Sequence, residues 1–400
     1  MDQEKKVKKF ETAFIVKDAK TYTNAEEAWF QFSGNKEGSI LFIIIPKEDP
    51  NNTLDIFNET IDPDKWEKII WYKSHSNYAP KWLKRKMKKS LLFKLIMNGR
   101  EYIYNFLDRI GLDRLGKKYG PIDVVFSGHR NTQEHLAFAL KPKELYIMDS
   151  GMRIQKRIQP TGYINDRKRS KRKPISYILH KLVAFKIFDR KKTKIFTVYN
   201  DLIETKHQIV ENDYSYRKML VKKKITGDDV FFVSSPIFNR ENISIQNYIV
   251  FIKEIFEELN LDPSNVIYIP HPVYEKKKEV QLIVDSLECR VDNRDIPIET
   301  KIALNDKLPK LCVSPYSSSI ANIASFSEGK FPLAYAWHPE IDCFKEMVVW
   351  KENFIFKNPN IKLIELKNVT SIFGFKKDDC NKPKYKNFKD WDAAMIKNEA

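Results

Sequence analysis

The chain has 400 residues, of which 42% are hydrophobic and 31% charged. A single hydrophobic core stops growing at roughly 250 to 300 residues, and a chain this apolar is not disordered, so two folded domains are expected. Lys and Arg outnumber Asp and Glu by 70 to 53, and the net charge of +17 favours a polyanionic partner. The longest apolar run, around Ile40–Pro46, is too short to span a membrane, and the charged first residues are not a secretory signal.

Four cysteines lack the close spacing that a zinc site or a redox motif requires. They are Cys289, Cys312, Cys343 and Cys380. Scattered thiols suit a reducing compartment, so we expect a cytoplasmic protein that holds no metal ion.

Short β-branched or aromatic runs alternate with segments of helical spacing along the whole chain. This pattern is typical of α/β units around a parallel sheet, whose ligands bind beyond the carboxyl ends of the strands. The spacing of Ile245–Leu259 predicts a helix. The clearest predicted strands are Thr12–Val16, Ser39–Ile45, Asp123–Ser127 and Glu144–Met148 in the first half, and Lys194–Tyr199, Asp229–Val233, Asn265–Ile269 and Lys310–Val313 in the second.

An Asp-x-Asp pattern occurs once near the start, as Asp62-Pro63-Asp64. In metal-dependent transferases such a pattern follows a strand. Here it precedes Lys65–Lys73 (KWEKIIWYK), whose spacing looks helical, so we interpret it as a helix cap with proline in the first turn.

The densely charged run Asp166–Pro174 (DRKRSKRKP) predicts an exposed loop, and the domain boundary is placed after it, near Arg190. The predicted organisation is an N-terminal domain over residues 1–190 and a C-terminal domain over 191–370. The remaining segment, 371–400, is expected to pack back on the N-terminal domain.

Asp149 follows a predicted buried strand in YIMDSG, and Gly151 allows a sharp turn after it. A carboxylate in this position can act as a general base. The alternative is that Asp149 only caps the turn.

Two prolines flank His271 at the end of another predicted strand, VIYIPHP. They fix the backbone and therefore the direction of the imidazole, which can donate to a phosphate oxygen. The alternative is an ordinary structural hydrogen bond.

Serines follow two further predicted strands. Ser234-Ser235-Pro236 follows FFV, and VSPYSSSIA carries Ser317, Ser318 and Ser319 before helical spacing resumes. Serine at a helix start satisfies free backbone N–H groups, and the same helix end can bind an anion, so capping and anion binding are both open.

In this order, the three elements resemble the acidic-Gly, HP and Ser-Ser motifs of the bacterial capsule polysialyltransferase family, glycosyltransferase family 38, and the related lipooligosaccharide sialyltransferases of family 52. The stretches FSGHRNTQEHL, KELYIMDSG and TAFIVKDAKTYTNAEEAW are also similar to that family. One departure is Ser150, which stands where the family motif usually has a second acidic residue. Asp149 is then the only candidate base in the motif.

The resemblance implies a GT-B architecture of two Rossmann-like α/β domains facing across a cleft. It also implies an inverting, metal-independent sialyltransferase that uses CMP-sialic acid as donor, with Asp149 as base and His271 stabilising the departing phosphate. No cofactor is expected. The residues assigned to the donor are Pro272, Ser234, Ser235, Ser317, Ser318, Ser319 and Gly128. The residues assigned to an acidic glycan acceptor are His129, Arg130, Arg153, Arg167, Lys168, Arg169, Lys171, Arg172 and Lys173.

Two basic runs, Lys81–Lys89 and Arg167–Lys173, fit an acceptor that carries one carboxylate per sugar. They also fit peripheral association with the anionic inner face of the cytoplasmic membrane or with capsule machinery, and a solvated face without a partner is the usual meaning of a single charge run.

The sequence leaves several rival functions open. The acceptor could end in sialic acid, giving an α-2,8 or α-2,9 linked polymer, or in galactose. A transferase with another nucleotide donor and a non-catalytic polysaccharide scaffold are further alternatives. A nucleic-acid-binding protein is the remaining rival, but zinc-finger spacing and RNA-binding motifs are lacking, so no nucleic-acid partner is expected.

Overall fold

The computed structural model consists of two compact units, Met1–Tyr216 and Arg217–Glu399. Side chains of residues 91–102 and 131 are not described. The structure describes residues 10–47, 53–75, 91–128, 131–149, 193–200, 207–235, 244–271, 277–294, 296–317, 319–337, 355 and 358–366.

The first unit contains a parallel sheet of seven strands in the order β3-β2-β1-β4-β5-β6-β7. Most of these strands are nearly continuous apolar runs, as expected for a sheet covered on both faces. The strands are β1 (Thr12–Val16), β2 (Ser39–Pro46), β3 (Lys68–Ser74), β4 (Val124–Ser127), β5 (Glu144–Met148), β6 (Thr193–Thr197) and β7 (Ile209–Glu211).

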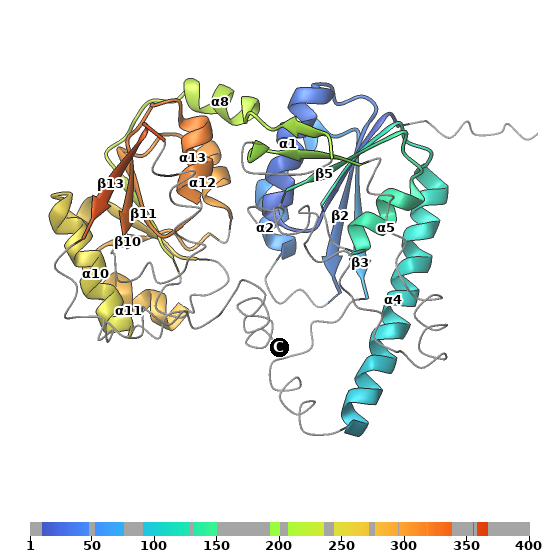
Figure 1. Cartoon of the computed structure of the whole chain (residues 1–400), viewed down its shortest axis with the longest axis horizontal. Helices are drawn as coiled ribbons and strands as arrows, with labels where there is room; N and C mark the ends of the chain where they lie inside the picture. The colour runs from blue at the N-terminus through green and yellow to red at the C-terminus, as the bar shows by residue number, and fades with distance from the viewer. Residues whose placement is uncertain are drawn as a thin grey trace, which may run out of the picture. The chain divides into compact units, whose positions relative to one another are not determined.

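Helices cover both faces of this sheet (Figure 1). On one face, α1 (Ala19–Phe32) and α2 (Thr53–Thr60) pack against a core that includes Phe14. On the other, α4 (Leu91–Tyr119) and α5 (Asn131–Ala139) pack against a core that includes Ile15. Successive residues of β1 thus face opposite layers, as the period of two in a strand requires.

The second unit contains a parallel sheet of six strands in the order β10-β9-β8-β11-β12-β13. Helices α10 (Ile245–Glu258) and α11 (Lys277–Leu287) share a core with one face of the sheet, while α12 (Ile298–Leu304) and α13 (Ser319–Ser327) lie on the other (Figure 1). Helix α8 (Ser215–Lys222) contains the boundary between the units. The strands are β8 (Val230–Val233), β9 (Val266–Ile269), β10 (Arg290–Val291), β11 (Leu311–Pro315), β12 (Leu333–Trp337) and β13 (Ile361–Glu365).

The predicted α/β class with two Rossmann-like domains is confirmed. Each of the eight predicted strands overlaps an observed strand, and α10 coincides with the predicted helix to within one residue.

The helical interpretation of Lys65–Lys73 was wrong. The capping part holds, because Asp62 accepts a hydrogen bond from the Asp64 backbone at 3.0 Å at the start of a short 3-10 turn, η1 (Pro63–Lys65). The chain then forms β3, which pairs with β2 over its whole length. Exposed and partly buried side chains alternate along this edge strand, so its hydrophobic pattern is weak and does not identify a strand. Pairing with β2 determines the structure of this segment.

The first unit extends to Tyr216, beyond the boundary near residue 190 that the sequence indicated. The reason is that β6 and β7 add to the edge of the first sheet through β5. Residues 371–400, expected to pack on the N-terminal domain, lie outside the described residues.

Candidate functional site

Asp149 directly follows β5 at the carboxyl edge of the first sheet and is only 1% exposed. Its backbone N–H donates to the carbonyl of Phe196 on β6 at 3.2 Å. Asn24, in the second turn of α1, donates from Nδ2 to the Asp149 main-chain oxygen at 2.7 Å and to Oδ1 of its carboxylate at 3.2 Å. Both the backbone and the carboxylate of Asp149 are therefore held by neighbouring elements.

Asn24 is itself oriented by a second buried asparagine. Asn212, which follows β7, donates from Nδ2 to Oδ1 of Asn24 at 3.1 Å. The sequence analysis missed both asparagines, because they lie 125 and 63 positions from Asp149 and join it only through the fold.

Gly128 directly follows β4, the neighbour of β5, and therefore lies at the same sheet edge as Asp149. Its backbone N–H donates to the carbonyl of Ile15 at 3.2 Å, and a Cβ here would come within 2.4 Å of Gln133 Nε2. Close approach of Gln133 explains the glycine. Gly128 was assigned to the donor, but the structure places it in the unit of Asp149 rather than with the other predicted donor residues.

A histidine that the sequence analysis did not single out lies at the same edge. His75 follows β3, and its Nδ1 lies 3.2 Å from Oδ1 of Asp108, a fully buried carboxylate on α4. Asp108 also accepts from the His75 backbone at 2.6 Å and from Ser74 at 2.7 Å. A carboxylate at Nδ1 fixes the imidazole and leaves Nε2 for another partner, an arrangement suited to binding or proton transfer.

In the second unit, Ser234 and Ser235 follow β8 and are both buried. The Ser234 hydroxyl lies 2.9 Å from the Tyr248 hydroxyl and accepts from Tyr268 at 2.8 Å, while the Ser235 backbone N–H donates to Tyr248 at 3.3 Å. These bonds hold the start of the loop against α10 and β9. The Ser234 hydroxyl thus anchors the residues that directly follow β8.

His271 lies just beyond β9 and is partly exposed, and Ser317 lies just beyond β11. Strands β9, β8 and β11 are neighbours, so the fold brings the ends that carry His271, Ser234 and Ser317 to one sheet edge. Ser317 Oγ accepts from the backbone N–H of Ser319, the first residue of α13, at 3.2 Å. Ser317 therefore satisfies one backbone N–H group at the start of α13.

The remaining predicted site residues lie outside the described residues. They are Pro272 and Ser318 of the donor set, and His129, Arg130, Arg153, Arg167, Lys168, Arg169, Lys171, Arg172 and Lys173 of the acceptor set.

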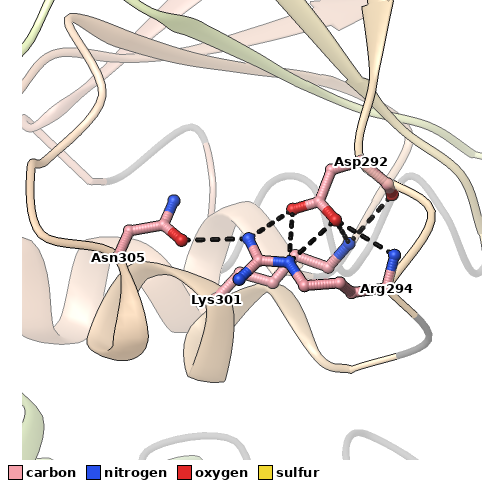
Figure 2. Close-up of polar contacts among 4 residues, drawn as sticks. All are labelled: Asp292, Arg294, Lys301 and Asn305. Carbon is pink, nitrogen blue, oxygen red and sulfur yellow. Dashed lines mark hydrogen bonds and ion pairs between the residues drawn. The ribbon is translucent and has the colours of Figure 1, made fainter.

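A pocket of about 580 Å³ lies beside the edge strand β10 of the second unit. Figure 2 shows the charged cluster at this position: Arg294 binds the Asp292 carboxylate with three hydrogen bonds of 2.5 to 3.1 Å, and it also donates to Asn305 at 2.9 Å. Lys301, on α12, lies 3.2 Å from the same carboxylate. Burial would raise the pKa of Asp292, but the Arg294 hydrogen bonds and the Lys301 charge outweigh it and lower this pKa to about 2. The cluster links the end of β10 to α12.

In the part of the chain that the structure describes, three or more His, Cys, Asp or Glu side chains never come together as a metal site would require. The helices there include none with the length and apolar character needed to cross a membrane. Cys289 and Cys312 are buried free thiols, and burial raises the pKa of Cys289 to about 11.

The first parallel sheet carries a hydrogen-bonded carboxylate at its carboxyl edge, and the second carries serines and a histidine. Such an arrangement is typical of α/β enzymes that act on nucleotide-linked substrates. The sequence matches the family model described as alpha-2,8-polysialyltransferase over residues 16–331. The chain belongs to this family, and it is a glycosyltransferase.

A search of curated proteins finds no match. Solved structures that resemble this chain include a glycosyl transferase of family 9 from Veillonella parvula (12% identity, 98% of each chain covered, TM-score 0.37). They also include the ADP-heptose LPS heptosyltransferase II of E. coli (11% identity, 98% of this chain and 100% of the other, TM-score 0.36). A third is the UDP-GlcNAc 2-epimerase of Methanocaldococcus jannaschii (12% identity, 92% and 94%, TM-score 0.40). TM-scores below 0.5 are too low for these likenesses to support an inference about the chain.

Proposed function

We propose that this protein transfers sialic acid from CMP-sialic acid to the end of a sialylated glycan in capsule polysaccharide synthesis. The observation that carries the proposal is the match to the alpha-2,8-polysialyltransferase family over residues 16–331, a range that includes Asp149, His271 and the serines. Because the chain is a glycosyltransferase, the alternative of a non-catalytic protein that only binds polyanions no longer applies.

In the proposed reaction, the Asp149 carboxylate takes the proton of the acceptor hydroxyl. The acceptor oxygen attacks the anomeric carbon of the donor sugar, the bond from that carbon to the phosphate oxygen breaks, and CMP leaves with the bonding electrons. One displacement inverts the anomeric carbon. The position of Asp149 at the carboxyl edge of a parallel sheet and its fixed hydrogen bonds support this role.

The departing phosphate gains negative charge, which the second unit would stabilise. His271 can donate to a phosphate oxygen, and the start of α13 at Ser319 presents backbone N–H groups that favour an anion. The common sheet edge of β8, β9 and β11 supports this assignment. Because CMP is already a good leaving group, we infer that transfer needs no metal ion, and a chelator should leave the rate unchanged.

The test is to incubate the purified chain with CMP-sialic acid and acceptors that end in sialic acid or in galactose, and then to size the products and determine their linkage. Sialylated acceptors should be extended, with the α-2,8 linkage of the family name as the first expectation and α-2,9 as the second. Extension of galactose-ended acceptors alone would support the lipooligosaccharide alternative. Consumption of another nucleotide sugar instead would contradict the proposed donor.

We also propose peripheral binding to an anionic membrane. Apolar side chains at positions i, i+3 and i+4 of α4, namely Ile103, Phe106 and Leu107, are exposed, Ile103 to 60%. The basic run Lys81–Lys89 precedes this helix. An apolar stripe beside basic residues is the usual composition of a surface-binding helix.

Flotation with vesicles that contain anionic lipid tests this proposal. Changing Ile103, Phe106 and Leu107 together to Ser should reduce the bound fraction, whereas Leu282→Ser, at another exposed apolar position on α11, should not. Equal binding of both variants would contradict the proposal.

A further inference from the structure

Helix α1 is buried along Thr21–Ala28, and one of its buried side chains, Asn24, is an amide. A buried amide must place a donor group and an acceptor group correctly, because an unsatisfied buried polar atom is costly. Asn24 meets this requirement with a carboxylate on one side and a second amide on the other.

The hydrogen bonds that join Tyr214, Asn212, Asn24 and Asp149 all run from donor to acceptor in a single consistent arrangement. They start from the backbone N–H of Tyr214, which can only donate, and which bonds to Oδ1 of Asn212 at 3.2 Å. Nδ2 of Asn212 must then face Asn24, and it donates to Oδ1 of that residue at 3.1 Å. Nδ2 of Asn24 is thereby turned toward Asp149, where it meets the main-chain oxygen at 2.7 Å and Oδ1 at 3.2 Å.

We propose that Asn24 is a positioning residue for the Asp149 carboxylate and that Asn212 sets the orientation of Asn24. The proposal rests on the proposed function of Asp149 as the base. Asn24 contacts the main chain and the carboxylate of the same residue, so it fixes the side-chain torsion of Asp149 relative to its backbone. An ionised carboxylate only accepts hydrogen bonds, and the fixed direction of the two amides supplies the donor that it needs.

A positioning role has a kinetic consequence that a purely structural role lacks. A catalytic group misplaced by about 1 Å can cost on the order of 10²-fold in rate, while substrate binding by other residues is untouched. Loss of the Asn24 donor should therefore lower kcat and leave KM for donor and acceptor unchanged. A structural role would lower only thermal stability, and turnover per folded molecule would remain.

Three variants test the hydrogen-bonded series from Asn212 through Asn24 to Asp149. Asn24→Ala removes the donor, and Asn24→Asp replaces it by an acceptor facing the carboxylate, so kcat should fall by about 10²-fold in both. Asn212→Asp keeps the acceptor for the Tyr214 N–H but loses the donor to Asn24, and it should lower kcat by a smaller factor, about 10-fold. This third variant leaves α1 unchanged and covers the case in which the first two fail to fold.

Ser39→Ala is the matched control. Ser39 is fully buried at the amino end of β2, the opposite edge of the same sheet, and its hydroxyl bonds to the Asn35 carbonyl at 3.0 Å and lies 2.9 Å from Ser33 Oγ. This variant loses buried hydrogen bonds far from Asp149, so its melting temperature should fall and its kcat should stay at the wild-type value.

A double-mutant cycle shows whether Asn24 acts through Asp149. In the Asp149→Ala background, Asn24→Ala should cause no further loss of turnover. Wild-type kcat in the folded Asn24 and Asn212 variants, together with loss of turnover in Asp149→Ala, would overturn the positioning role and leave the base assignment standing. Wild-type turnover in Asp149→Ala would overturn both.

Discussion

The two candidate edges of this protein are built from different chemical groups. At the first, Asp149 is buried and held by amide groups from α1 and from the end of β7. At the second, buried hydroxyls of Ser234, Tyr248 and Tyr268 bond to one another at the carboxyl end of β8.

This difference matches the two tasks that the proposed reaction sets. A base needs one carboxylate oxygen in a fixed place, which amides with a single orientation provide. A phosphate with growing charge needs several donors around it, and the His271 imidazole and the start of α13 can supply such donors, while the buried hydroxyls fix the end of β8. Variants at the two edges should therefore differ in the kind of loss that they cause.

The largest effect is expected for Asp149. Asp149→Asn keeps an acceptor for Asn24 but removes the base, so turnover should fall by about 10⁴-fold with little change in folding. Titration calorimetry with CMP serves as the control, because CMP affinity should equal that of the wild type. Retained turnover would remove Asp149 from the reaction.

A smaller loss is expected at the second edge. His271→Ala should lower turnover by about 10²-fold, since one donor to the departing phosphate is lost. CMP affinity should fall as well, in contrast to Asp149→Asn. A variant that binds CMP as the wild type does and turns over normally would contradict the donor assignment.

The basic run Arg167–Lys173 should contribute more to the binding of long acceptors than of short ones. Replacing Arg167, Lys168, Arg169, Lys171, Arg172 and Lys173 by Gln removes contacts that add up along an acidic chain. We expect KM for long sialylated acceptors to rise about 10-fold and KM for short ones to change little, with the difference vanishing at high salt. Equal changes at both lengths would argue against an extended acceptor groove.

The smallest effect on activity is expected from the Asp292 cluster, which follows β10 at the outer end of the second edge and to which the proposed reaction assigns no role. Because the pKa of Asp292 in the folded protein, about 2, is below its ordinary value of 3.8, the ionised form stabilises the fold above about pH 4, and this contribution is lost as the pH falls toward 2. Asp292→Asn should lower the free energy of unfolding by about 2 kcal/mol at pH 7.

Denaturant unfolding measures this change, which should be roughly half as large at pH 3 as at pH 7. Turnover per folded molecule should not change. A loss of stability that is the same at both pH values would show that the Asp292 charge does not contribute.

The sequence predicted the elements that carry strong local patterns. Apolar β-branched runs such as Ser39–Ile45 identified the strands, and the strand-to-loop positions of Asp149 and His271 identified the candidate edges. These features are local, so periodicity and turn residues report them directly.

Features that depend on tertiary pairing were not predicted. The edge strand β3 looked helical, and β7 and β10 are too short for a periodic pattern. Asn24, Asn212 and the His75–Asp108 pair reach the first edge from elements far apart in sequence, and a single asparagine or histidine has no spacing that marks it. Sheet order and helix packing create these contacts.

The most direct test of the account is the anomeric configuration of the transferred sugar, followed by NMR during the first turnovers with CMP-sialic acid. A single displacement assisted by the Asp149 carboxylate predicts a product whose anomeric carbon is inverted relative to the donor, with one CMP released for each sugar transferred. A product with retained configuration would contradict it.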